Sequence, residues 1–90
     1  MARHNLTSQY DSRKDFYGKA TVEECADGTI KLFSYDTHVA SIFVKGSEKT
    51  AEVYGWYSQT TGRHIKEFLK QHGFRARSKE QILEDYGKEW

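Results

Sequence analysis

The sequence predicts an α+β domain in which a four-stranded antiparallel meander is followed by two C-terminal helices. Apolar and polar residues alternate with a period of two in several runs between Tyr17 and Tyr57, which is typical of strands. From about residue 60 the apolar period becomes 3.6, and a second capped segment starts at Ser78. Because the strands come first and the helices afterwards, we expect the first helix to pack on one face of the sheet.

Length and composition fit one small domain. The chain has 90 residues, 37% hydrophobic and 14% aromatic, which is too aromatic for a disordered tail and too polar for a membrane span. The N-terminal residues lack the apolar stretch of a signal peptide. The single cysteine, Cys25, cannot form an internal disulfide, which favours a reducing compartment. We therefore expect a cytoplasmic protein that makes no membrane contact.

The strands are expected between well-defined turn signals. Residues 1–15 are polar and without a period, so they are interpreted as an N-terminal arm, with one helical turn after residue 7 or 8, ahead of a single domain over residues 16–90. The first strand contains Ala20 and Val22, and Asp-Gly at 27–28 predicts a hairpin. The remaining strands are expected at 30–35, 38–44 and 51–57, with a turn at 36–37 and a loop at 45–49.

Both helices carry start and stop signals. In the first, apolar residues and His72 recur at helical spacing, Ser58, Thr60 or Thr61 can cap its start, and Gly73 suits its end. In the second, Ser78 and Gln81 fit a capping box, and Gly87 ends the helix. The apolar residues of the two helices are Ile65, Phe68 and Leu69 in the first and Ile82, Leu83 and Tyr86 in the second.

Alternation assigns the two sheet faces. The face that meets the first helix is expected to hold Ala20, Val22, Ile30, Leu32, Ala40, Ile42, Val44, Ala51 and Val53, and the opposite face Tyr17, Phe33, Tyr35, Val39, Phe43, Tyr54 and Trp56. An aromatic second face is unusual, because a solvated sheet face is normally polar. Either the second helix or the arm covers it, or a protein partner or second copy binds there, or nucleic-acid bases stack on it. The candidate aromatic contact face is Phe33, Tyr35, Tyr54 and Trp56.

Charge is unevenly distributed along the chain. The net charge of +1 is composed of −1 over residues 1–62, +5 over 63–79 and −3 over 80–90. At helical spacing the basic residues of the first helix lie opposite its apolar stripe, which suits contact with phosphates or with an acidic protein. The alternative is an ordinary solvated helix face, partly neutralised by the acidic last helix. The candidate basic contact surface is Arg63, His64, Lys66, Lys70, Arg75 and Arg77.

Motifs for catalysis are absent from the sequence. There is no phosphate-binding Walker loop and no Gly-x-Ser-x-Gly elbow, and the histidines and Cys25 do not have metal-ligand spacing. Asp36 and His38 are close, but no nucleophile accompanies them. His72 is interpreted as a histidine at the edge of the core. We therefore expect no catalytic, cofactor or metal site, and a protein that is not an enzyme.

Four strings carry a resemblance to a known family. They are Phe-Tyr-Gly-Lys-Ala at 16–20, Ser-Tyr-Asp-Thr at 34–37 followed by Val39-Ala40, Val-Tyr-Gly-Trp-Tyr-Ser at 53–58, and Thr-Thr-Gly-Arg-His-Ile-Lys-Glu-Phe-Leu-Lys-Gln-His-Gly-Phe at 60–74. Over residues 5–74 the chain resembles short uncharacterised proteins encoded by bacteriophages and mobile elements of Gram-positive bacteria. The resemblance implies an origin but no activity.

Together, these observations favour a small binding protein. The leading hypothesis is a non-enzymatic protein of phage or mobile-element origin that contacts a host protein or nucleoprotein, with inhibition of a host or defence protein as one version. The alternative is a nucleic-acid-binding protein that uses the basic helix and the aromatic sheet face. A homodimer through the aromatic face is a third option.

Overall fold

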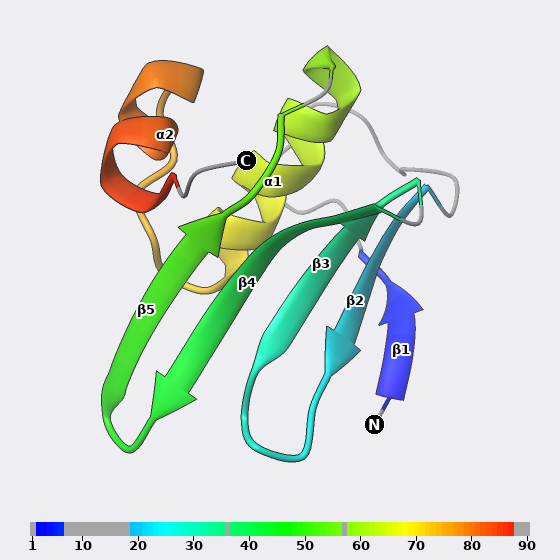
Figure 1. Cartoon of the computed structure of the whole chain (residues 1–90), viewed down its shortest axis with the longest axis vertical. Coiled ribbons are helices and arrows are strands. Elements are labelled where there is room, and N and C mark those ends of the chain that lie inside the picture. The colour runs from blue at the N-terminus through cyan, green and yellow to red at the C-terminus, as the bar shows by residue number, and fades with distance from the viewer. Residues whose placement is uncertain (1, 7–18, 36, 57, 88–90) are drawn as a thin grey trace.

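A five-stranded antiparallel sheet and two helices make up the part of the chain that the structure, a computed structural model, describes, namely residues 2–6, 19–35, 37–56 and 58–87. The strands follow one another across the sheet in chain order, so the sheet is a simple meander (Figure 1). They are β1 (Ala2–Asn5), β2 (Ala20–Glu24), β3 (Ile30–Ser34), β4 (Thr37–Lys45) and β5 (Glu48–Val53), followed by α1 (Gln59–Gln71) and α2 (Lys79–Tyr86).

The predicted α+β class and meander are confirmed, but the sheet has one more strand than expected. Residues 2–5, interpreted as part of an arm, form β1 and pair with β2, with Asn5 opposite Thr21. The N–H of Leu6 donates to the carbonyl of Ala20 at 2.9 Å, and the Leu6 side chain is buried. His4 and Asn5 are exposed, and this edge strand is held by backbone pairing with β2. Its sequence therefore shows no apolar alternation. Residues 7–15 of the predicted arm lie outside the described residues.

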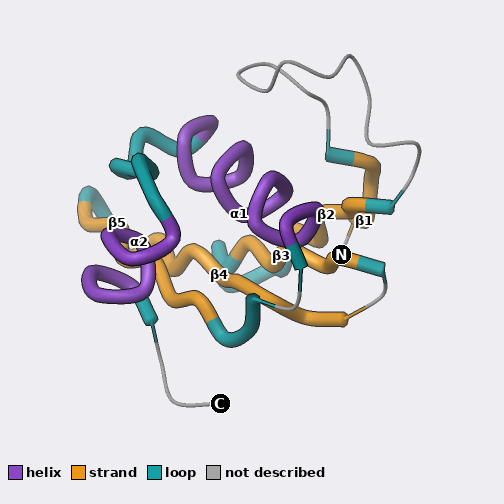
Figure 2. Tube along the Cα trace, turned by 90° about the horizontal axis from the view of Figure 1, so that it is seen from above, coloured by secondary structure: helices purple, strands orange, loops and turns teal. Residues whose placement is uncertain are grey.

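The core lies between the sheet and α1, as the alternation predicts. Figure 2 shows α1 crossing one face of the sheet, while α2 lies beside β5. All nine residues assigned to that face are buried in the core or packed against it. Ile65, Phe68 and Leu69 of α1 are fully buried against them. The apolar residues of α2 join the same core, so α2 does not cover the opposite face of the sheet, which we call the outer face.

Two local irregularities change the predicted outer face. Leu32 pairs with Ala40 but Phe33 pairs with His38, so Val39 is an extra residue in β4, and it is fully buried in the core rather than on the outer face. β3 ends at Ser34, one residue earlier than predicted. Tyr35 occupies the following turn with a φ of 52°, and therefore its side chain does not continue the alternation.

The last hairpin is tighter than predicted. Instead of a loop over 45–49, Lys45 pairs with Glu48, and Gly46 takes a φ of 63° in the two-residue turn between them. β5 therefore starts three residues before the predicted start at residue 51 and ends at Val53 rather than Tyr57. The charged side chains of Glu48 and Lys49 are exposed on the strand, which explains why no apolar pattern marks its start.

The predicted start and end residues of both helices are confirmed. Ser58 is the N-cap of α1 and accepts a hydrogen bond from the N–H of Thr61, and Gly73 follows its end with a φ of 82°. Ser78 caps α2 by accepting from the N–H of Gln81, and Gly87 is the C-cap. The Gln81 side chain accepts from the N–H of Arg77 at 2.7 Å rather than from that of Ser78, so only half of the predicted capping box forms. Within the described parts of the chain, no helix combines the length and apolarity that a membrane crossing requires.

Candidate functional site

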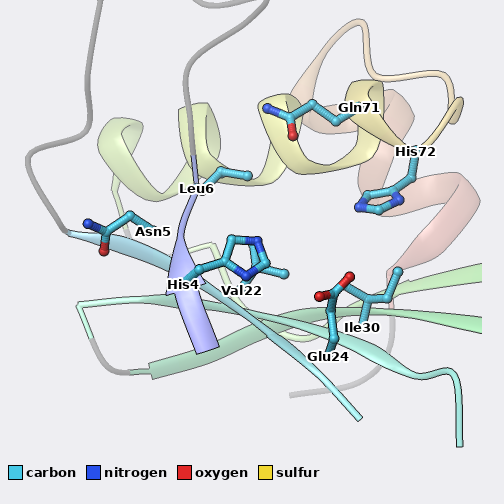
Figure 3. Close-up of a pocket in the computed structure, with 8 residues that line it drawn as sticks. All are labelled: His4, Asn5, Leu6, Val22, Glu24, Ile30, Gln71 and His72. Carbon is cyan, nitrogen blue, oxygen red and sulfur yellow. The ribbon is translucent and has the colours of Figure 1, made fainter. Parts of the chain in front are cut away.

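Three hollows formed by described residues differ sharply in charge. The smallest, about 170 Å³, lies between the β1–β2 edge and the end of α1. Figure 3 shows His72 reaching down toward Glu24, with His4 on the strand side. Its floor includes Val22 and Ile30. This volume is below the roughly 300 to 1,000 Å³ usual for small-molecule sites.

A second hollow, of about 440 Å³, lies beside β5 and α2. Lys49 is its single basic residue, and Glu52 and Asp85 line it as well. Phe74 and Tyr86 form its aromatic wall, with their rings perpendicular and 5.7 Å apart. Because carboxylates outnumber the cation, this hollow does not suit an anionic ligand.

The third hollow is the one that carries positive charge. It has a volume of about 380 Å³, and its lining within the described part of the chain contains no carboxylate. Two of its basic residues come from the predicted basic surface, and one aromatic residue comes from the predicted aromatic face. We call it the cationic groove, and its lining residues are Trp56, Gln59, Gly62, Arg63, Lys66 and Lys79.

The fold places Trp56 in the cationic groove through the end of β5 and a glycine of α1. Since β5 ends at Val53, Trp56 no longer follows the strand alternation, and it packs against the core on the α1 side. A Cβ on residue 62 would lie 2.7 Å from Cε2 and 2.9 Å from Nε1 of Trp56. Only glycine at position 62 therefore allows the indole to rest directly on the helix backbone.

The cations approach the groove from two helices. Arg63 and Lys66 lie one turn apart on α1 and are half-buried, whereas Lys79 begins α2 and is exposed. The Nζ atom of Lys79 lies 5.8 Å from the centroid of the Trp56 ring, within range of a cation–π interaction. The first turn of α1 holds no acidic residue, so the positive end of the helix dipole adds to the positive potential of these side chains.

The remaining residues of the predicted basic surface do not share this groove. Lys70, Arg75 and Arg77 are exposed, on α1 and on the segment that leads to α2, but they do not line the hollow. His64 is fully buried, so its assignment to the basic contact surface is wrong. The physical reason is a hydrogen bond to Ser34 on β3, thirty residues away, that no helical pattern can show.

His64 belongs to a buried polar network between α1 and β3. Its Nδ1 lies 2.9 Å from the hydroxyl of Ser34, which lies 3.2 Å from the hydroxyl of Thr61. The hydroxyl of Ser58 donates to that of Thr61 at 3.3 Å, so the network extends to the helix cap. Neither Ser34 nor His64 lines any of the three hollows. The network therefore joins α1 to β3.

The four residues of the predicted aromatic face divide among three locations. Phe33 and Tyr54 lie with His38 in one row, with ring centroids 5.3 Å apart for Phe33 and His38 and 5.0 Å for His38 and Tyr54. Tyr35 instead lies near α1, with its ring 6.0 Å from His64, and its exposed fraction is 51%. Trp56 lies in the cationic groove. Of these four residues, only Phe33 and Tyr54 remain on the outer face. His38 joins them there, which the alternation could not predict because Val39 is an extra residue in β4.

Burial alters the titration of three side chains. It lowers the pKa of His38, whose Nε2 lies 2.7 Å from the hydroxyl of Ser41. It also lowers the pKa of His72, which packs edge-on against Phe68 at the edge of the core, as predicted. Burial raises the pKa of Tyr54. None of these groups lines the cationic groove.

The described residues offer no cluster of three or more histidine, cysteine or acidic side chains that could hold a metal ion. The free Cys25 is half-buried, with its Sγ 3.9 Å from a carboxylate oxygen of Glu23.

Comparison with known proteins places most of the chain in a family of unknown function. The model of a family of unknown function, DUF8033, matches residues 4–84. This agrees with the predicted membership of an uncharacterised family and extends ten residues beyond the expected end at residue 74, so that it reaches into α2. No curated protein and no solved structure matches the chain. Every residue that lines the cationic groove lies inside the matched region.

Proposed function

Because the chain belongs to the DUF8033 family, whose function is unknown, we propose a function from its own residues: a non-enzymatic protein that binds nucleic acid through the cationic groove. One observation carries this proposal. The groove combines Arg63, Lys66 and Lys79 with the indole of Trp56, and none of the described residues that line it is acidic. Closely spaced cations that bind phosphates gain affinity by releasing the counterions condensed on a nucleic acid.

The proposal includes the predicted origin and location: the protein is encoded by a phage or mobile element and acts in the cytoplasm of the bacterial host. Nucleic acids and nucleoproteins are abundant anionic partners there. Binding to nucleic acid is then the way in which this protein contacts a host macromolecule. The nearly balanced charge of the whole chain, +1, makes the local concentration of cations on α1 the feature that directs such contacts.

Fluorescence anisotropy with labelled 20-nucleotide DNA and RNA, single- and double-stranded, tests the proposal. We expect binding at 50 mM salt by the natural protein and a loss of at least tenfold in the R63Q/K66Q variant. The matched control is K45Q/K49Q, which removes the same charge at the exposed β4–β5 turn, at the far end of the sheet (Figure 1). Equal affinity of the natural protein and the groove variant for every oligonucleotide would overturn the proposal.

An acidic protein surface is the competing ligand, and polyglutamate distinguishes it. If polyglutamate of matched charge competes as well as single-stranded DNA, the groove recognises charge alone and the partner is an acidic protein. If oligonucleotides compete at much lower concentration, nucleic acid is the ligand.

A further inference from the structure

We infer that the cationic groove is a single-strand site in which Trp56 stacks on one base while Arg63, Lys66 and Lys79 hold the neighbouring phosphates. This inference rests on the proposed function and names the form of nucleic acid that the groove recognises. The volume of about 380 Å³ lies within the range usual for small-molecule sites, which is the scale of one nucleotide.

The indole of Trp56 is presented as a rigid platform. Its ring rests on the backbone of α1 at Gly62, so one side of the side chain is fixed by the helix. It is half-buried rather than buried, and it lines the groove. Little conformational entropy is then lost when a base packs on it, because the ring is already held in place.

The cations are arranged around the ring rather than along a line. Arg63 and Lys66 approach from α1, and Lys79 approaches from α2 with its Nζ 5.8 Å from the ring centroid. A base that stacks on the free face of Trp56 takes the place of the Lys79 ammonium over the ring, and its phosphate then meets three cations supplied by two helices. A stacking aromatic side chain within a basic groove is the usual arrangement for binding single strands without sequence preference.

A duplex does not fit this arrangement equally well. In a duplex each base face is already stacked on its neighbour, so an indole beside a helix cannot reach it without unstacking the base. The aromatic row on the outer face is a poorer alternative, because Glu52 accepts a hydrogen bond from Tyr54 there and a carboxylate repels phosphate. The combination of an accessible ring with three cations therefore favours the cationic groove over the outer face as the binding site, and single strands over duplexes as the ligand.

Tryptophan fluorescence tests stacking directly. The chain holds two tryptophans, Trp56 and Trp90, so the W90F variant reports on Trp56 alone. We expect quenching of W90F by oligothymidine, and affinity for an abasic oligonucleotide of the same length lower by roughly 5- to 150-fold, the usual contribution of one stacked base. W56L in the natural background is expected to lose a similar factor for oligothymidine and little for the abasic strand.

The controls separate this inference from the proposed function. Y35L removes an exposed aromatic ring outside the groove, so its affinity for oligothymidine should stay that of the natural protein. Circular dichroism of W56L and Y35L checks that both variants fold. Equal binding of oligothymidine and the abasic strand without quenching overturns stacking but leaves the proposed function standing, as does duplex binding as tight as single-strand binding. Absence of binding to every oligonucleotide overturns both.

Discussion

The contact between the indole of Trp56 and the helix backbone requires a glycine at position 62, and the G62A variant tests this contact. In the middle of a helix, alanine normally stabilises by about 1 kcal/mol relative to glycine. Here the added Cβ would lie 2.7 Å from Cε2 of Trp56, whereas carbon atoms pack at about 3.5 to 4.0 Å. The indole must therefore move by about 1 Å from its place on α1.

The expected magnitude follows from these opposing terms. Overpacking of this kind costs about 1–3 kcal/mol, so we expect G62A to lower the free energy of unfolding by up to about 2 kcal/mol despite its better helix propensity. In the W56A background the obstacle is gone, and the same substitution should raise the free energy of unfolding by about 1 kcal/mol. The change of sign is the signature of direct contact.

Urea denaturation followed by circular dichroism measures all four proteins of this cycle without relying on tryptophan fluorescence. The cycle should give a coupling of about 1–3 kcal/mol between the two positions. If G62A stabilises the natural and W56A proteins by the same amount, the indole does not rest on residue 62 and the geometry of the groove is wrong.

Three further predictions concern the rest of the fold. S34A removes the hydroxyl that bonds His64, and should lower the free energy of unfolding in urea by about 1–3 kcal/mol; no change would show that the network is not stabilising. S58A removes the N-cap of α1, and thermal unfolding should show a loss of about 0.5–2 kcal/mol, whereas an unchanged melting temperature would exclude the cap. The lowered pKa of His38 and His72 means that the unfolded chain binds more protons between their folded pKa values and 6.5, so stability should fall as the pH is lowered from 7.5 through 6.5. H38Q/H72Q should flatten this dependence, and a profile as steep as that of the natural protein would contradict the assignment.

The inner half of the sheet was predictable from sequence because side chains alternate along a strand. Residues such as Val22, Leu32 and Ile42 face α1 as expected, and the prediction needed no knowledge of neighbouring strands. The residues of the outer face were not predictable in the same way, because alternation holds only while the strand is regular. The extra residue at Val39 and the positive φ at Tyr35 both interrupt it, and neither has a distinctive sequence signal.

The candidate site was predictable in part for a similar reason. Helical spacing placed Arg63 and Lys66 together, since both depend only on α1. The other components depend on contacts between distant segments: Trp56 leaves β5 to pack on α1, and Lys79 arrives from α2. The glycine that breaks helix propensity at position 62 was the available signal, because a glycine in a helix interior needs a packing reason.

The salt dependence of the affinity shows whether the cationic groove binds phosphates. Three phosphate contacts to a single strand predict a slope of about −2 for the logarithm of the association constant against the logarithm of salt concentration, or about a 20-fold loss between 50 and 200 mM. The natural protein should show this slope with oligothymidine, and replacing Arg63, Lys66 and Lys79 together by glutamine should bring it close to zero. A slope that is the same in both proteins would contradict the claim that the cationic groove binds nucleic acid.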